Sequence, residues 1–202
     1  MKYWYDNQFV QVKYKSSLSK GWKLRNGVRQ GGILSGHLFN IYINSLLEKI
    51  ANMKIGCKLG IVKSNIIAYA DDIILLAPSA DSLQLIMNEA LLAASELDLE
   101  FNLNKTKVMK FCGSKVKYNA PLAKQFKLND HYIENVSTFR YLGYIISSNL
   151  SNNEDIIRTK NKFYAEFNSI LRKFSFVERN VKLFLFKQYC LQFYGVELWF
   201  GR

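Results

Sequence analysis

The chain has 202 residues, of which 49% are hydrophobic and 14% aromatic, enough for one sizeable core or two small ones, and this composition excludes a disordered chain. Its 28 Lys and Arg against 16 Asp and Glu give a net charge of +12, which predicts a polyanionic partner, nucleic acid before an anionic membrane surface. No run of about 20 residues is free of charge, so we expect a soluble chain without a membrane span.

The amino terminus and the cysteines predict an intracellular protein, cytoplasmic or nuclear and not secreted. Residues 1–15 have neither the apolar stretch nor the small-residue cleavage site of a signal peptide. Cys57, Cys112 and Cys190 are far apart, odd in number and flanked by apolar residues. We interpret them as reduced core thiols, with a metal or disulfide role as the minor alternative.

The first elements along the chain are a hairpin, a loop and a helix. Residues 3–15 alternate well enough for a strand, and GWKLRNG (21–27) predicts its hairpin partner. Residues 27–36 form a glycine-rich loop, and LFNIYINSLLEKIA (38–51) predicts a helix. The apolar segment 64–79 predicts a second hairpin.

A well-marked helix follows this second hairpin. Apolar residues recur at helical spacing from Leu83 to Leu97, Pro78 marks the preceding break, and either Ser79 or Asp81 is suited to cap the first turn.

The second half of the chain predicts strands and then helices. Four short strands are expected at 108–112, 125–128, 131–135 and 139–146, with Asn129-Asp130 as a turn and antiparallel pairing throughout. Helices are expected at 153–175 and 178–199, after a polar boundary at 147–153. The fold class is therefore α+β.

Asp71 and Asp72 are two adjacent acids inside the apolar segment IIAYADDIILLA (66–77). Burying a carboxylate without a partner is costly, and neighbouring carboxylates repel unless a cation lies between them. Three hypotheses fit this pattern: a solvated turn, a proton-sharing acid/base pair, and a divalent-metal site, since carboxylate oxygens are suited to Mg²⁺ or Mn²⁺.

The loop NGVRQGGILSG (26–36) contains four glycines, which indicates unusual backbone angles or close approach of another molecule. A plain structural turn is the alternative. The spacing matches neither the P-loop nor the Rossmann fingerprint. Ser35 and His37 lack a local acid to orient them, so we do not expect a hydrolase.

Five segments in order resemble the reverse transcriptases, in particular those of non-LTR (LINE-type) retrotransposons. They are GVRQGGILS followed by LFNIYIN (27–44), AYADDIILLA (68–77), FNLNKTKVMKF (101–111), FRYLGYII (139–146) and YGVELW (194–199). The resemblance spans nearly the whole chain. It implies a partial polymerase palm, an antiparallel sheet with packed helices, at residues 1–147, followed by the helical start of a thumb at 148–202.

The resemblance also implies roles for named residues. Asp71 and Asp72 are implied to be catalytic and to bind Mg²⁺ or Mn²⁺, with Asp72 the weaker ligand. Lys105, in the motif Asn102-x-x-Lys105, is implied to approach the leaving pyrophosphate, the alternative being one more solvated cation. Nucleotide and template binding is implied for Gly27, Arg29, Gln30, Gly31, Gly32, Ser35 and Tyr69. A primer grip, a β-turn element that seats the primer end, is implied for Phe139, Tyr141, Leu142 and Gly143. A plain core role is the alternative for Phe139 and Tyr141.

The implied partners are an RNA template, a DNA primer and deoxynucleoside triphosphates, with no membrane. Basic residues of the thumb helices are implied to follow the phosphate backbone: Arg158, Lys160, Lys162, Arg172 and Lys173.

Two departures from the family pattern change the expected function. Gly36-His37 stands where the family usually has Pro, so the loop's turn is less firmly fixed. The family's upstream aspartate strand and fingers have no counterpart, because Asp6 is the sole acid before Gly27 and its context is wrong. We therefore expect the carboxyl-side part of a reverse transcriptase, inactive without the missing upstream palm and fingers segment. A degenerate relic that holds nucleic acid nonspecifically, and a viral RNA-directed RNA polymerase, are the alternatives.

Overall fold

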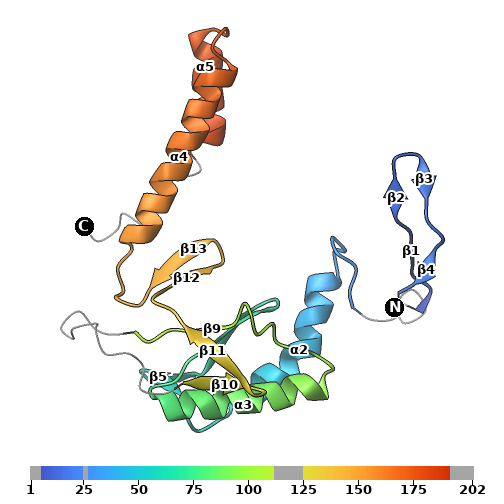
Figure 1. Cartoon of the computed structure of the whole chain (residues 1–202), viewed down its shortest axis with the longest axis vertical. Coiled ribbons are helices and arrows are strands. Elements are labelled where there is room, and N and C mark those ends of the chain that lie inside the picture. The colour runs from blue at the N-terminus through green and yellow to red at the C-terminus, as the bar shows by residue number, and fades with distance from the viewer. Residues whose placement is uncertain (1–5, 25–26, 112–124, 192–202) are drawn as a thin grey trace. The chain divides into compact units, whose positions relative to one another are not determined.

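The structure is a computed structural model that describes residues 6–24, 27–111 and 125–191. Contacts divide the chain into two compact units, Met1–Phe101 (the first unit) and Asn102–Arg202 (the second unit). Both mix helices with small sheets, which agrees with the predicted α+β class (Figure 1). The predicted domain boundary at residues 147–148 stays a prediction.

The first unit begins with a long hairpin, as predicted. Strand β1 (Phe9–Val10) pairs with β4 (Trp22–Lys23), and β2 (Lys13–Tyr14) pairs with β3 (Ser17–Leu18), all antiparallel (Figure 1). Two residues on the outgoing side, 11 and 12, oppose three on the returning side, 19 to 21, so the hairpin contains a bulge. Residues 3–5 of the predicted strand lie outside the described residues.

Two helices, α2 (Ser35–Ala51) and α3 (Ala80–Glu96), form the core of the first unit. Small residues on α3 let the helices approach closely, and the buried cluster consists of Leu46, Ile50, Ile86, Ala90, Ala93 and Ala94. The predicted cap of α3 is confirmed for Ser79, whose Oγ accepts a hydrogen bond from the Ser82 amide at 3.2 Å.

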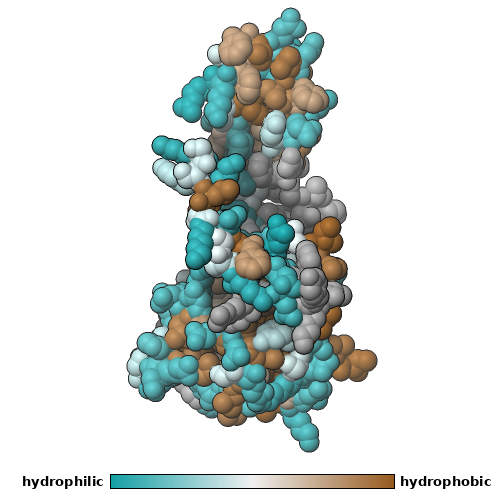
Figure 2. Space-filling view, turned by 90° about the vertical axis from the view of Figure 1, so that its right-hand side faces the viewer, coloured by the Kyte–Doolittle hydropathy of each residue, from teal (hydrophilic) through white to brown (hydrophobic). Residues whose placement is uncertain are grey.

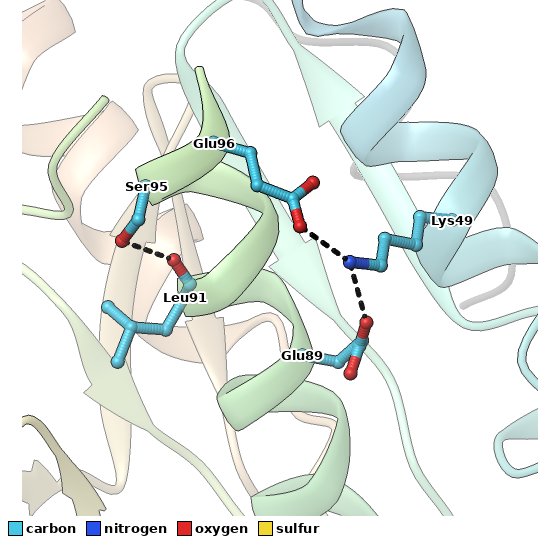
Figure 3. A network of polar contacts seen from close by, with 5 residues as sticks. All are labelled: Lys49, Glu89, Leu91, Ser95 and Glu96. Atoms are coloured by element: carbon cyan, nitrogen blue, oxygen red, sulfur yellow. Dashed lines mark hydrogen bonds and ion pairs between the residues drawn. The ribbon is translucent and has the colours of Figure 1, made fainter. Parts of the chain in front are cut away.

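An exposed ion-pair cluster also joins α2 to α3. Lys49 of α2 lies 2.9 Å from a Glu89 oxygen and 3.3 Å from a Glu96 oxygen, both on α3, while Ser95 Oγ donates to the Leu91 carbonyl nearby (Figure 3). The hydrogen bond to Glu89, reinforced by Glu96, raises the pKa of Lys49. Because all three charged side chains are in contact with solvent, these ion pairs add little to the free energy of unfolding.

Four short strands lie between α2 and α3. They form two antiparallel hairpins, β5 (Cys57–Leu59) with β6 (Val62–Ser64), and β7 (Ile66–Tyr69) with β8 (Asp72–Leu75). Ile66, Ile73 and Leu75 pack against the α2–α3 core. The predicted hairpin at 64–79 is thus confirmed.

A three-stranded sheet opens the second unit, in the order β10 (Phe126–Leu128), β11 (His131–Asn135), β9 (Lys107–Val108). The turn predicted at Asn129-Asp130 joins β10 to β11, and both residues have positive φ, +44° and +53°. The prediction of antiparallel pairing throughout is wrong, because β9 runs parallel to β11. Residues 109–130, which connect these two strands, are long enough for a parallel crossover.

The strand predicted at 139–146 is two strands. β12 (Thr138–Tyr141) and β13 (Tyr144–Ser147) form an antiparallel hairpin around Leu142 and Gly143, with φ of +46° and +89°. Two residues with positive φ make the type of tight turn that matches strand twist. The single-strand prediction failed because Leu at the first turn position is not a turn-forming residue.

Helices α4 (Asn153–Lys173) and α5 (Arg179–Tyr189) end the described part of the second unit. Phe163 and Phe167 of α4 each contact Phe186 of α5 edge to face, at 6.0 and 5.6 Å between ring centroids. Hydrophobic side chains are interspersed with hydrophilic ones over this helical pair at the top of Figure 2. Residues 192–199 of the last predicted helix lie outside the described residues.

Two sequence expectations concern the cysteines and the membrane. Cys190 is a free thiol that is fully buried after α5, in agreement with the predicted core position, and burial raises the pKa of this thiol. Cys57 is free and partly buried, and Cys112 lies outside the described residues. Within the described part of the chain, every helix is too short or too polar to cross a bilayer.

Candidate functional site

The two acids lie at the tip of the β7–β8 hairpin, which we call the acid hairpin. Tyr69 pairs with Asp72, so Ala70 and Asp71 are the two residues of the turn. Ala70 has φ of +52°, a conformation that costs a non-glycine residue about 1 kcal/mol, and tight two-residue turns demand it. Asp71, Asp72 and Tyr69 are all exposed. Ile66, Ile73 and Leu75 of the apolar flanks are partly buried against the α2–α3 core, while the carboxylates at the tip keep contact with water.

Asn65 anchors the base of the acid hairpin to the end of α2. Its side chain is 2% exposed, and its Nδ2 donates to the carbonyls of Ile50 at 3.1 Å and Met53 at 3.0 Å. Its own carbonyl accepts from the Leu76 amide at 2.8 Å. The Ile50 carbonyl also accepts from the Met53 amide at 3.1 Å, so Asn65 adds a second donor there and joins the end of α2 to the strands of the acid hairpin.

Gly56 leaves the space that the Asn65 side chain occupies. A Cβ at residue 56 would lie 1.8 Å from Asn65 Oδ1, and φ of Gly56 is +152°. Sequence analysis missed both residues, because an asparagine at the start of a strand is indistinguishable from a loop residue without the helix end it contacts.

We expect Asn65→Ala to destabilise the first unit by about 1 to 3 kcal/mol, because it removes the buried side-chain donor to the Ile50 and Met53 carbonyls. Hydrogen exchange of α2 core amides at increasing urea concentration measures the effect on this unit. The control is Asn44→Ala, whose side chain donates to Glu48 on the exposed face of the same helix and which we expect to change stability by less than about 0.5 kcal/mol. Equal losses in the two variants would contradict the anchoring role.

The glycine-rich loop is closed by Ser35. Ser35 Oγ donates to the Arg29 carbonyl at 2.6 Å, and the Gly32 amide donates to the same oxygen at 3.1 Å. A Cβ on Gly32 would lie 2.5 Å from Ser35 Oγ, so a larger residue there would displace the Ser35 hydroxyl from its bond to Arg29. Gly27 and Gly31 have φ of +88° and +76°. Backbone conformation therefore favours glycine at residues 27 and 31, and the close Ser35 hydroxyl favours it at residue 32.

The exposed residues of the loop include Arg29, Gln30 and His37. Helix α2 begins at Ser35, three residues earlier than predicted, and Gly36 lies in its first turn without positive φ. Gly36 thus lies in the helix and not in the loop, and the expectation that it fixes the turn less firmly than Pro stays a prediction. The first turn of a helix also accepts Pro, so this departure from the family pattern is structurally conservative.

Helix α2 supports both elements of the first unit that sequence analysis singled out. The loop closed by Ser35 leads into its amino-terminal end, and Asn65 binds its carboxyl-terminal end and begins the strand leading to Asp71. The loop and the acid hairpin are thus attached to one rigid helix.

Lys105 and Asn102 form a turn just before β9. Asn102 Oδ1 and its carbonyl both accept from the Lys105 amide, at 3.2 and 3.1 Å, and its carbonyl also accepts from Thr106 Oγ1. The asparagine of the motif therefore fixes the backbone from which the exposed Lys105 side chain projects. These residues lie in the second unit.

The β12–β13 hairpin is tied to α4 by a buried carboxylate that sequence analysis missed. Asp155 is 2% exposed, and its Oδ1 accepts from the Ile145 amide at 2.9 Å and from Arg158 Nε at 2.8 Å. Phe139 and Tyr141 are half-buried, whereas Leu142 and Gly143 are exposed at the turn. Arg158 is engaged with Asp155, so its guanidinium is less available to a phosphate than the sequence analysis expected.

Among residues 6–24, 27–111 and 125–191, no group of three or more Asp, Glu, His or Cys side chains gathers where it could hold a metal ion. The acid hairpin contributes two hard oxygen donors and leaves the other coordination positions to be filled from elsewhere.

Comparison with known proteins gives two findings. A family model described as reverse transcriptase (RNA-dependent DNA polymerase) matches residues 1–146. A stretch of 79 residues, 39% of the chain, is 37% identical to the "Retrovirus-related Pol polyprotein from type-2 retrotransposable element R2DM" of Drosophila melanogaster. The match spans 7% of the length of that relative.

Proposed function

Because the chain belongs to the reverse transcriptase (RNA-dependent DNA polymerase) family, we propose that it forms part of the polymerase of a non-LTR retrotransposon and extends a DNA primer on an RNA template within a complete protein. The family predicted from the sequence motifs is confirmed. The observation that carries the proposal is the pair of exposed acids on a hairpin whose base packs against the α2–α3 core, inside the region that the family model matches.

Asp71 and Asp72 are proposed to hold Mg²⁺ or Mn²⁺. Their oxygens are hard ligands, exposed and projecting from a hairpin fixed by Asn65, which fits these ions. When bound, the ions supply Lewis-acid activation and charge neutralisation for nucleotidyl transfer. The role of the hairpin is to hold two carboxylates in place before substrate arrives, because positioning and preorganised charge account for most of the rate in such reactions.

The other predicted residues are proposed to position substrate. The glycine-rich loop, with its backbone shaped by Ser35, is proposed to lie against the template and the nucleotide, and Tyr69 beside them. Lys105 supplies a cation on a turn fixed by Asn102. The exposed turn at Leu142 and Gly143 is proposed to seat the primer end, while the half-buried Phe139 and Tyr141 support it.

We propose that this chain supplies the carboxyl-side part of the palm and the start of the thumb, and that a further carboxylate comes from another segment of the complete protein. Two adjacent acids alone leave most coordination positions of a metal to water. The same shortage favours the second candidate function, a relic that binds nucleic acid without catalysis. Incorporation by the completed protein separates the two candidates.

We expect the 202-residue chain to bind Mn²⁺ weakly at the acid hairpin, and Asp71→Asn to remove this binding, because the substitution removes a charged oxygen donor. Titration of the Mn²⁺ electron paramagnetic resonance signal measures the free ion directly. Asp130→Asn is the matched control, since Asp130 is also an exposed acid in a two-residue hairpin turn. The same Mn²⁺ affinity in the wild type and in Asp71→Asn would show the metal assignment to be wrong.

A further inference from the structure

Residues 8–24, which we call the lysine hairpin, combine strands β1 to β4 with an unusual charge composition. Lys13, Lys15, Lys20 and Lys23 are all exposed, and the segment contains no Asp or Glu. All charged side chains of this segment are therefore positive. An acid-free, lysine-bearing surface favours a polyanionic ligand over a protein surface of mixed charge.

Three aromatic side chains accompany these lysines and are largely exposed. Phe9 is 68% exposed, Tyr14 71% and Trp22 47%. Lys15 Nζ lies 5.6 Å from the centroid of the Tyr14 ring. In the described residues these strands pair only with one another, and a lone two-stranded hairpin is marginal in water. The aromatic rings thus remain available to a ligand that would also order the hairpin.

We propose that the lysine hairpin is a binding site for single-stranded RNA, with its lysines on phosphates and its aromatic rings stacked on bases. Exposed rings on a basic strand surface are the features that bind unpaired bases. A duplex is disfavoured as the ligand, because its bases are already stacked inside the helix. This site is separate from the acid hairpin and does not depend on the proposed catalysis.

The chain contains a second basic hairpin that serves as a matched control. Lys54, Lys58 and Lys63 lie in and beside strands β5 and β6 and are also exposed, but the exposed apolar residues there are Ile61 and Val62, not aromatic rings. Replacing three lysines by Gln in either hairpin changes the net charge equally. Any difference in RNA affinity between the two variants is then caused by the position of the lysines and not by the total charge.

The experiment measures binding of a fluorescent uridine oligonucleotide to the full chain by anisotropy, with EDTA present, over a range of salt concentrations. We expect K13Q/K15Q/K23Q to weaken binding about tenfold more than K54Q/K58Q/K63Q, and to reduce the slope of log K against log salt by about 2. K13R/K15R/K23R keeps the charges and should bind like the wild type. Equal losses in the two Gln variants would overturn the proposal.

Tyr14→Leu tests the stacking half of the proposal. This variant keeps an apolar side chain, and we expect it to bind the oligonucleotide about tenfold more weakly. Wild-type affinity in Tyr14→Leu, or duplex RNA bound as tightly as single-stranded RNA, would overturn the proposal. Because EDTA removes the metal ions that the proposed catalytic site requires, a failure of RNA binding here is distinct from a failure of that site.

Discussion

We expect Asp71→Asn to abolish deoxynucleotide incorporation on a primed RNA template by the chain completed with an upstream palm and fingers segment from a related element. The loss should be at least about 10³-fold, because the variant removes a carboxylate proposed to hold the metal ions that would neutralise the developing negative charge. Asp71 is one of the two residues of the turn, so the substitution leaves the pairing of Tyr69 with Asp72 intact. Primer extension with labelled deoxynucleotide measures the effect.

Two further proteins serve as controls in this primer-extension experiment. Asp130→Asn in the same completed protein should extend the primer like the parent, since it changes the same charge at a different hairpin. The 202-residue chain without the upstream segment should give no extension, because two adjacent carboxylates cannot hold two metal ions at the separation that transfer requires. Robust extension by the chain alone would mean that Asp6 or another acid of this sequence fills the missing position.

Sequence patterns predicted the elements whose causes are local. Ser79 lies before an apolar helical stripe, and its hydroxyl caps α3 as expected. Asn129-Asp130 lies between two short apolar runs, and it forms the β10–β11 turn. The acids at residues 71 and 72 interrupt an apolar segment, and they occupy the tip of a hairpin. In each case the residues that determine the structure are within a few positions of one another.

The features that sequence analysis missed depend on contacts between distant residues. Asn65 is important because of carbonyls at residues 50 and 53, and Asp155 because of an amide at residue 145 and a guanidinium at 158. The parallel pairing of β9 with β11 likewise joins segments separated by residues 109–130. Asn65 and Asp155 matter to stability because they are buried and hydrogen-bonded. A single buried polar residue leaves no periodic signal in the sequence.

We expect Asp155→Ala to destabilise the second unit by about 3 kcal/mol. Asp155 is buried, and its removal leaves the Ile145 amide and the Arg158 guanidinium without their acceptor. Arg158 retains some contact with water, which keeps the loss below that of a fully buried pair. Because the chain has two units, hydrogen exchange of the Ile145 amide is a better measure than one global unfolding free energy.

Glu154→Ala separates the loss of this contact from the loss of a negative charge at the start of α4. Glu154 and Asp155 both lie in the first turn of α4, where a carboxylate interacts favourably with the helix dipole. Glu154 differs in being exposed. The dipole effect is therefore shared by the two variants and amounts to less than about 1 kcal/mol. Any greater loss in Asp155→Ala must come from the link to Ile145 and Arg158. Equal protection of the Ile145 amide in the two variants would show that α4 does not hold the β12–β13 hairpin through this carboxylate.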